Sequence, residues 1–395
     1  MKNETAPAET SSPRGLSHGP LRILFAGSPA IAVPSLEMIA AGALEGRWVL
    51  AGALTNPDSR RGRSDRPEPT DVGAAAQALA GRFTGKEEAA GAAGERLAAP
   101  GLSPPAILAF DTLKAEAREA AAALRPDLLV SFAYGKIFGP RFMALFPLGG
   151  INAHPSLLPR YRGASPIQEA ILRGDAETGV CVQRIAAEMD TGNILARTVI
   201  PLSGTETAAS LSETAAVLGA EVLQKVLEQF ADALASGEAP PEGLPQRGEA
   251  SYCGIIGKDA GIIDWEESAA AVAARVRAYN PWPLTRTAHR GRVLHILEAR
   301  PLPEPGPPPA AGSGPAPGPV PAAESACAGP ESTCPGRVLG TDRQFGILVE
   351  TGQGILGITR LQYRAKKALP WRDFLNGARD FIGSRVQGGG EDNGV

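Results

Sequence analysis

Residues 21–237 alternate short apolar runs with helical segments, and this alternation is the strongest constraint on the fold. The runs 21–27, 48–54 and 127–133 have the length and apolar content of buried strands. Apolar residues at helical spacing follow the first run, over 33–41. A strand, a helix and a second strand in this order predict a right-handed crossover between parallel neighbours. We therefore expect an α/β fold, a doubly wound and mostly parallel Rossmann-like sheet.

The rest of the 395-residue chain is long enough for a second domain. Prolines and mixed charges over 238–250 predict a linker. Beyond it, a helical segment at 271–279 and several short strand-like runs predict a small OB-like β-barrel domain over 251–386. Residues 301–335 hold twelve prolines among Gly, Ala and Ser, which predicts an insert without a core. The catalytic domain is then expected to be 21–237.

Composition indicates where the protein is expected to lie in the cell and which partners are unsuited to it. Residues 1–20 are polar and lack the apolar core of a signal peptide, and no stretch reaches the roughly 18 apolar residues that span a bilayer. The cysteines, at 181, 253, 327 and 334, are scattered and fit no zinc site, so we expect reduced thiols and no metal. The net charge of −3 argues against indiscriminate coating of nucleic acid. We expect a cytoplasmic monomer without a membrane partner, with disordered tails at 1–20 and 387–395.

Two polar residues that can do chemistry, Asn152 and His154, stand two positions apart in the segment Gly-Gly-Ile-Asn-Ala-His. In a strand they project from the same face. Pro155 and Pro159 stop the strand, so the pair should lie at its end, where ligands of open α/β sheets bind. Asp190, 36 positions after His154, supplies a carboxylate.

An Asn, a His and an Asp without a neighbouring nucleophilic Ser or Cys suit direct transfer of an acyl-type group. The amide of Asn152 and a protonated His154 could stabilise an oxyanion, each donor contributing about 3–4 kcal/mol. Asp190 would keep His154 cationic, fix its tautomer and accept the proton of an attacking amine. On these residues alone, a surface histidine and an ordinary Asp-Thr-Gly turn remain the alternatives.

The segment 153–167, together with 189–192, resembles the signature of folate-dependent formyltransferases. The catalytic Asn, His and Asp of that family fall on Asn152, His154 and Asp190. Other segments are similar to the branch of the family that formylates initiator methionyl-tRNA. These segments are 25–29, 55–58, 62–63, 130–135, 174–179, 263–265 and 280–283.

The resemblance implies 10-formyltetrahydrofolate as the co-substrate and no metal. It also implies a pterin pocket formed by loops that follow neighbouring strands, as the switch-point argument requires. The residues expected to line the folate are Tyr134, Gly135, Lys136, Ile137, Phe138, Ser156, Leu157, Leu158, Pro159, Ile185 and Met189.

Basic residues gather in two places that are suited to RNA phosphates. The loop 55–66 has four arginines against two aspartates, and 356–386 has seven basic residues against two acidic ones. In the family, the loop enters the acceptor stem, and Arg63 matches its arginine after glycine. The residues expected to contact tRNA are Arg60, Arg61, Arg63, Arg66, Arg364, Lys366 and Lys367.

The function we expect is transfer of formyl from 10-formyltetrahydrofolate to the α-amino group of initiator methionyl-tRNA. One alternative keeps the chemistry on a small acceptor: glycinamide ribonucleotide, an amino sugar nucleotide or water. Another is a non-catalytic RNA-binding relative. The basic loop and second domain favour tRNA, and the intact Asn, His and Asp favour an enzyme. The chain departs from the family at Ser64 and Asp65, where lysine is usual, in the longer 83–110 region and in the 301–335 insert.

Overall fold

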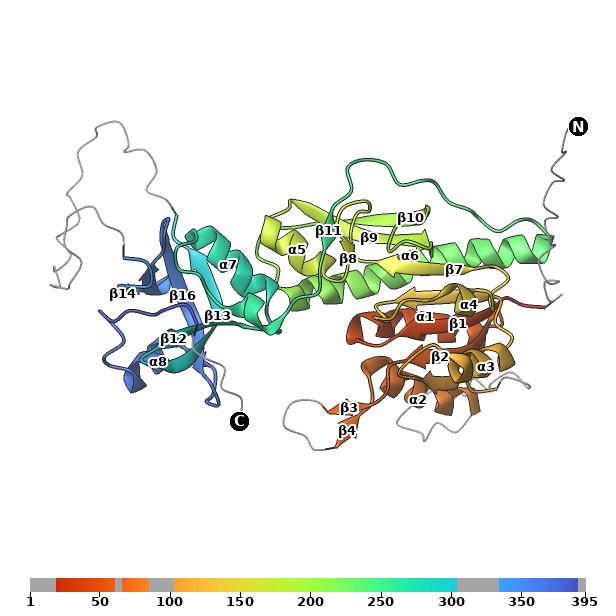
Figure 1. Cartoon of the computed structure of the whole chain (residues 1–395), viewed down its shortest axis with the longest axis horizontal. Coiled ribbons are helices and arrows are strands. Elements are labelled where there is room, and N and C mark those ends of the chain that lie inside the picture. Colours follow the sequence, from red (N-terminus) through yellow and green to blue (C-terminus); the bar gives the residue numbers. More distant parts are fainter. Residues whose placement is uncertain (1–18, 61–65, 85–102, 304–333, 390–395) are drawn as a thin grey trace, which may run out of the picture. The chain divides into compact units, whose positions relative to one another are not determined.

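The fold is that of a computed structural model, which describes residues 19–60, 66–84, 103–303 and 334–389 (Figure 1). The chain divides into two compact units. The first unit comprises Met1–Ala164, Glu177–Pro201 and Ser212–Cys253. The second unit comprises Ser165–Ala176, Leu202–Leu211 and Gly254–Val395. The linker expected at 238–250, and the domain bounds on either side of it, stay a prediction. Most of the proline-rich insert lies outside the described residues.

A seven-stranded sheet in the order β10-β9-β7-β6-β1-β2-β5 forms the centre of the first unit. The five strands β7, β6, β1, β2 and β5 run parallel to one another. Strand β9 is antiparallel to both of its neighbours, β7 and β10. The expected mostly parallel sheet is therefore confirmed. The strands are β1 (Arg22–Gly27), β2 (Val49–Thr55), β5 (Ala106–Ala109), β6 (Leu128–Phe132), β7 (Gly150–His154), β9 (Glu177–Arg184) and β10 (Ile194–Pro201).

Helices cover this sheet because their apolar faces need a partner. The central strand β1 is fully buried from Ile23 to Ala26. The long helix α6 (Ala208–Ser236) buries Leu223, Val226 and Phe230, which share one face because they are three and four positions apart. The other helices of the first unit are η1 (Ala30–Ala32), α1 (Val33–Leu44), α2 (Asp71–Thr84), α3 (Ala115–Ala123) and α4 (Pro140–Met143).

The second unit contains an antiparallel sheet in the order β12-β13-β16-β15-β14, with β17 on β16. The two edge strands are joined through the end of the chain: Ala288 of β12 pairs with Gln387, and the amide of Val338 in β14 donates to the carbonyl of Ser384. The antiparallel β domain is thus confirmed. Its strands are β12 (Thr285–His289), β13 (Arg292–Pro301), β14 (Val338–Asp342), β15 (Gly346–Glu350), β16 (Ile355–Tyr363) and β17 (Leu369–Pro370).

An apolar core holds the second unit together. Trp265, Val272, Ile296 and Phe381 are buried in it, and helix α7 (Ala269–Ala278) packs on β13. Helix α7 begins where the Ser268 hydroxyl accepts from the Ala271 amide, an ordinary N-cap. The remaining helices are α5 (Pro166–Arg173), η2 (Lys258–Gly261) and α8 (Trp371–Gly377).

Some expectations need correction. Strand β12 reads Thr-Arg-Thr-Ala-His and was not expected from the sequence, because its buried threonines give no apolar alternation. Cys181 and Cys253 are free and buried, but Cys334 is disulfide-bonded, so the expectation of reduced thiols is wrong for Cys334. Among the described residues no helix is long and apolar enough to cross a membrane.

Candidate active site

The end of strand β7 carries the two polar residues that the sequence singles out. Asn152 pairs with Gln183 of β9 and with Ser131 of β6, while His154 is the last residue of the strand and pairs with Cys181. Asn152 and His154 therefore project from one face, as expected. The half-buried amide of Asn152 makes no hydrogen bond to any residue in the described parts of the chain.

Asp190 lies beside His154 in the folded protein. Its Oδ2 atom is 3.6 Å from Nδ1 of His154, which is too long for a direct hydrogen bond. The other ring nitrogen, Nε2, is 2.8 Å from the carbonyl oxygen of Tyr161. A carbonyl oxygen can only accept, so Nε2 carries the hydrogen and Nδ1 faces the carboxylate. The fold thus brings Asn152, His154 and Asp190 into one region of the first unit.

Both carboxylate oxygens of Asp190 accept hydrogen bonds from neighbours. The Gln183 amide donates to Oδ1 at 2.8 Å, and the Gly163 backbone N–H donates to Oδ2 at 2.9 Å. Asp190 has a left-handed backbone with φ of 54°, which Asp tolerates better than most residues. With 11% of the side chain exposed, these two donors compensate the loss of water around the carboxylate.

Burial sets the protonation state of the histidine. The desolvation of His154 lowers its pKa from the usual 6.5, against smaller opposing effects of the Asp190 charge and the Tyr161 carbonyl. This direction opposes the sequence-based expectation of a cationic His154, which stays a prediction. With a neutral imidazole, Nδ1 and the Asp190 carboxylate are two acceptors that face each other.

A segment expected to be only a linker holds the backbone of the Asp190 loop. The side chain of Gln246 donates from Nε2 to the carbonyl oxygens of Asp190, at 2.8 Å, and Gly192, at 2.9 Å. Its Oε1 accepts from the guanidinium of Arg162 at 2.6 Å. Sequence reasoning missed Gln246, because it is separated from Asp190 by 56 positions and lies in no local pattern.

The same segment also holds the loop after His154. The Ser251 hydroxyl accepts from the Tyr161 amide at 2.9 Å, and β8 (Arg162–Gly163) pairs in parallel with β11 (Tyr252–Cys253). Gly163 has φ of 114°, and a Cβ atom there would lie 2.2 Å from the carbonyl oxygen of Cys253. Only glycine permits this approach, and it places the amide that donates to Asp190.

The residues after strand β6 form an aromatic row. Tyr134 and Phe138 stack with ring centroids 5.3 Å apart, and Phe138 stacks on Phe142 at 5.8 Å. Burial raises the pKa of Tyr134 to about 12, and its hydroxyl is without a hydrogen-bond partner within the described residues. The loop is tied to the strand β2 region, since the Asn56 amide donates to the Tyr134 carbonyl at 3.0 Å.

Other residues expected at the folate lie around these loops. Lys136 donates from Nζ to the carbonyl of Phe110 and lies over the Tyr134 ring, and burial lowers its pKa. Ser156 and Leu158 are buried, whereas Ile137 and Met189 are 78% and 57% exposed. That these residues line a ligand stays a prediction. In the described part of the chain, no group of three or more His, Cys, Asp or Glu could hold a metal ion.

The expected RNA contacts are only partly visible. Arg60 and Arg66 flank the tip of a hairpin in which β3 (Ser59–Arg60) pairs with β4 (Pro67–Glu68). Arg61 and Arg63 lie outside the described residues. In the second unit, the exposed residues Arg364, Lys366 and Lys367 follow the end of β16.

The lowered pKa of His154 has a consequence for stability. Because the folded protein resists protonation of His154, the unfolded chain binds this proton first as the pH falls. The stabilisation from neutral His154 is complete above about pH 6.5 and is lost as the pH drops below that value. We expect His154→Gln to reduce this loss, measured as the free energy of unfolding in denaturant between about pH 7.5 and pH 5.

His289, whose pKa burial also lowers, is present in both proteins and cancels in the comparison. The proton uptake of His154 can be followed directly by NMR. A His154 ring that gains its proton above pH 6.5 would contradict this prediction.

The contacts of Gln246 predict a local effect. Gln246→Leu leaves the carbonyls of Asp190 and Gly192 without their donor, which should lower the free energy of unfolding by about 1–3 kcal/mol. Amide hydrogen exchange at 188–192 should become faster than in the wild type. The control is Gln224→Leu on helix α6, where the amide donates to the side chain of Glu228. If both variants exchange alike at 188–192, Gln246 does not hold the loop.

Comparison with known proteins gives the family of the chain. Residues 27–227 match the model of the formyl transferase family, and residues 255–379 match its C-terminal domain. The methionyl-tRNA formyltransferase of Treponema denticola is 39% identical over 367 residues, which cover 92% of this chain and 98% of that protein. That of a Roseiflexus strain is 37% identical over 93% of this chain and 95% of its own length.

Solved structures show the same fold at low identity. The N-formyltransferase of Helicobacter canadensis superposes with a TM-score of 0.52 and 16% identity, over 87% of this chain and 99% of its own. A variant of HypX from Aquifex aeolicus gives a TM-score of 0.53 and 17% identity, over 92% of this chain and 50% of its own. Two matching domains and relatives aligned over almost their whole length leave one conclusion: the chain belongs to the formyl transferase family.

Proposed function

We propose that this protein transfers the formyl group of 10-formyltetrahydrofolate to the α-amino group of initiator methionyl-tRNA, in the cytoplasm. The observation that carries the proposal is the meeting of Asn152, His154 and Asp190 at the end of β7, in a formyl transferase whose relatives are methionyl-tRNA formyltransferases. The folate donor is supported by the Helicobacter canadensis structure, which is a complex with folinic acid.

Asn152 is the group best suited to the formyl oxygen. Its amide is half-buried at the strand end and, in the described residues, is not used in holding the protein together. When the amine attacks, negative charge develops on the formyl oxygen, and a fixed N–H donor stabilises that charge. One such donor contributes about 3–4 kcal/mol to the transition state.

The His154–Asp190 pair is suited to the proton of the amine. The amine must be neutral to attack, and its N–H can donate into the 3.6 Å space between Nδ1 of His154 and Oδ2 of Asp190. As the nitrogen–carbon bond forms, the amine proton passes to this pair. It is then delivered to the folate nitrogen as the bond between that nitrogen and the formyl carbon breaks. His154 becomes cationic only during the reaction, when Asp190 and the oxyanion stabilise it.

The loops on either side of β7 are our candidates for the pterin pocket. Tyr134 has a buried hydroxyl without a partner in the described residues, and Ile137 and Met189 expose apolar surface that a flat ligand could cover. We assign the folate to these residues, together with Gly135, Lys136, Phe138, Ser156, Leu157, Leu158, Pro159 and Ile185.

The acceptor decides between this function and its alternatives. Formyl transfer by the purified protein can be measured with 10-formyltetrahydrofolate and three acceptors: charged initiator tRNA, glycinamide ribonucleotide and a nucleotide-linked amino sugar. We expect formyl-methionyl-tRNA as the product that forms fastest. Formylation of a small amine instead would replace the tRNA proposal, and tRNA binding without formylation would make the chain a non-catalytic relative.

Removing any of the three polar side chains should affect the chemical step. We expect Asn152→Ala, His154→Ala and Asp190→Asn each to lower kcat by roughly 100-fold or more, with little change in KM for folate or tRNA. Asn is chosen at position 190 because it tolerates the left-handed backbone. The matched control, Asn376→Ala on the exposed surface of α8, should keep wild-type turnover. Near-normal turnover of His154→Ala would refute the mechanism.

The arginines of the loop 55–66 should affect the use of tRNA and not that of folate. Arg63→Ala and Arg66→Ala should each raise KM for tRNA and leave KM for folate unchanged. Each should also reduce the dependence of tRNA use on salt concentration by the amount expected for about one phosphate contact. Lys225→Ala removes an equal charge from the exposed side of α6 and serves as the control. Kinetics that match the control at every salt concentration would make the loop ordinary solvated surface.

A further inference from the structure

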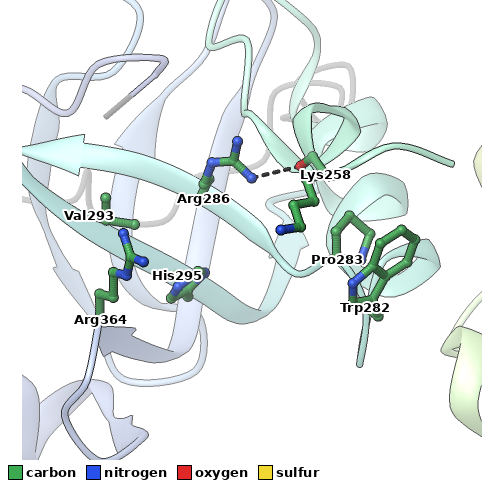
Figure 2. Close-up of a pocket in the computed structure, with 7 residues that line it drawn as sticks. All are labelled: Lys258, Trp282, Pro283, Arg286, Val293, His295 and Arg364. Atoms are coloured by element: carbon green, nitrogen blue, oxygen red, sulfur yellow. Dashed lines mark hydrogen bonds between the residues drawn. The ribbon is translucent and has the colours of Figure 1, made fainter. Parts of the chain in front are cut away.

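The second unit contains a pocket that the catalytic chemistry does not use. It has a volume of about 210 Å³ and lies on the surface of the antiparallel sheet (Figure 2). Its lining comes from η2, from the turn after α7, from β12 and β13, and from the residue that follows β16. The lining residues are Lys258, Trp282, Pro283, Arg286, Val293, His295 and Arg364.

The charge of the lining favours an anion. Arg286 is already used, since it donates to the Lys258 carbonyl at 2.6 Å and pairs with Asp259 at 2.8 Å. The ammonium group of Lys258, in contrast, makes no hydrogen bond or ion pair with the described residues. Arg364 adds another exposed cation on the other side of the pocket (Figure 2). With the Arg286 charge offset by Asp259, the lining keeps a positive surplus.

An exposed tryptophan lies next to these cations. Trp282 is 52% exposed, whereas Trp48 and Trp265 are only 2% and 4% exposed. Figure 2 shows Lys258 and the Trp282 indole on one side of the pocket with the Pro283 ring between them, and His295 between this side and Arg364. An aromatic face adjoining basic side chains is the combination that holds unpaired nucleotides, because the base stacks and the phosphates pair with cations.

The size of the pocket limits what it can hold. Pockets that enclose a whole drug-sized ligand measure about 300–1,000 Å³, so this one fits a part of a larger molecule. We propose that it binds one unpaired nucleotide of an RNA chain, with the base on Trp282 and the flanking phosphates at Lys258 and Arg364. The identification of this RNA as initiator tRNA rests on the proposed function. The pocket adds Lys258 and Trp282 to the basic residues expected from composition.

Binding of the full-length protein to initiator tRNA over a series of salt concentrations tests the proposal. Lys258→Ala should weaken binding and reduce the slope of log K against log salt by about 0.7–0.9, which is one phosphate contact. Trp282→Leu should weaken binding about 5- to 100-fold at unchanged slope, and Trp282→Phe should recover part of the loss. Arg343→Ala, which removes an exposed cation in the turn between β14 and β15 and outside the pocket, should reproduce the wild type.

Two outcomes would overturn the pocket assignment: an unchanged salt slope for Lys258→Ala, or Trp282→Leu binding as tightly as Arg343→Ala. Lys258 is exposed and Trp282 half-exposed, so these variants should keep the wild-type melting temperature.

The same titrations with a single-stranded oligoribonucleotide separate this proposal from the proposed function. A wild type that formylates tRNA while the pocket variants bind both RNAs normally refutes only the pocket. A wild type that fails to formylate, with weakened oligoribonucleotide binding in the variants, refutes only the function.

Discussion

The burial of a carboxylate beside a buried imidazole is the constraint on which the rest of the site depends. A carboxylate removed from water is costly unless its oxygens accept hydrogen bonds. The Gln183 amide and the Gly163 N–H provide these bonds to Asp190. Gly163 can reach Asp190 only because it lacks a Cβ atom that would collide with the Cys253 carbonyl, and Gln246 holds the backbone behind the carboxylate. A segment of the first unit that composition predicts to be a linker thereby supports the Asp190 loop.

The same burial separates the resting site from the reacting one. Desolvation outweighs the attraction of Asp190 and lowers the pKa of His154, which favours a neutral imidazole whose Nδ1 can accept an N–H beside the Asp190 carboxylate. In the proposed mechanism a cationic His154 would have no capacity to take the proton of the neutral amine. The left-handed backbone at Asp190 is a local strain that the hydrogen bonds of the loop sustain.

How far the sequence predicts this arrangement depends on whether the signal is local. The two-residue spacing of Asn152 and His154 predicts a common face of a strand, and β7 confirms it. The partners of Asp190 had no such signal, since Gln183 and Gln246 act through side-chain contacts that only the fold creates. Nor does the sequence show the desolvation that lowers the pKa of His154, because burial is a tertiary property. Strand β12 was not predicted because its buried residues include threonines in place of apolar residues.

In the second unit, a count of charged residues likewise predicts only part of the proposed RNA surface. A surplus of basic residues over 356–386 indicates a surface for phosphates, but it does not distinguish a cation that is already paired from one that is available. Arg286 is paired with Asp259, whereas Lys258 lines the same pocket as the exposed Trp282. The chemistry proposed at β7 requires only a neutral amine and a formyl donor, so it cannot by itself select one acceptor. Selection therefore requires contacts beyond the reacting atoms, and the proposed nucleotide pocket would supply one that a small amine cannot make.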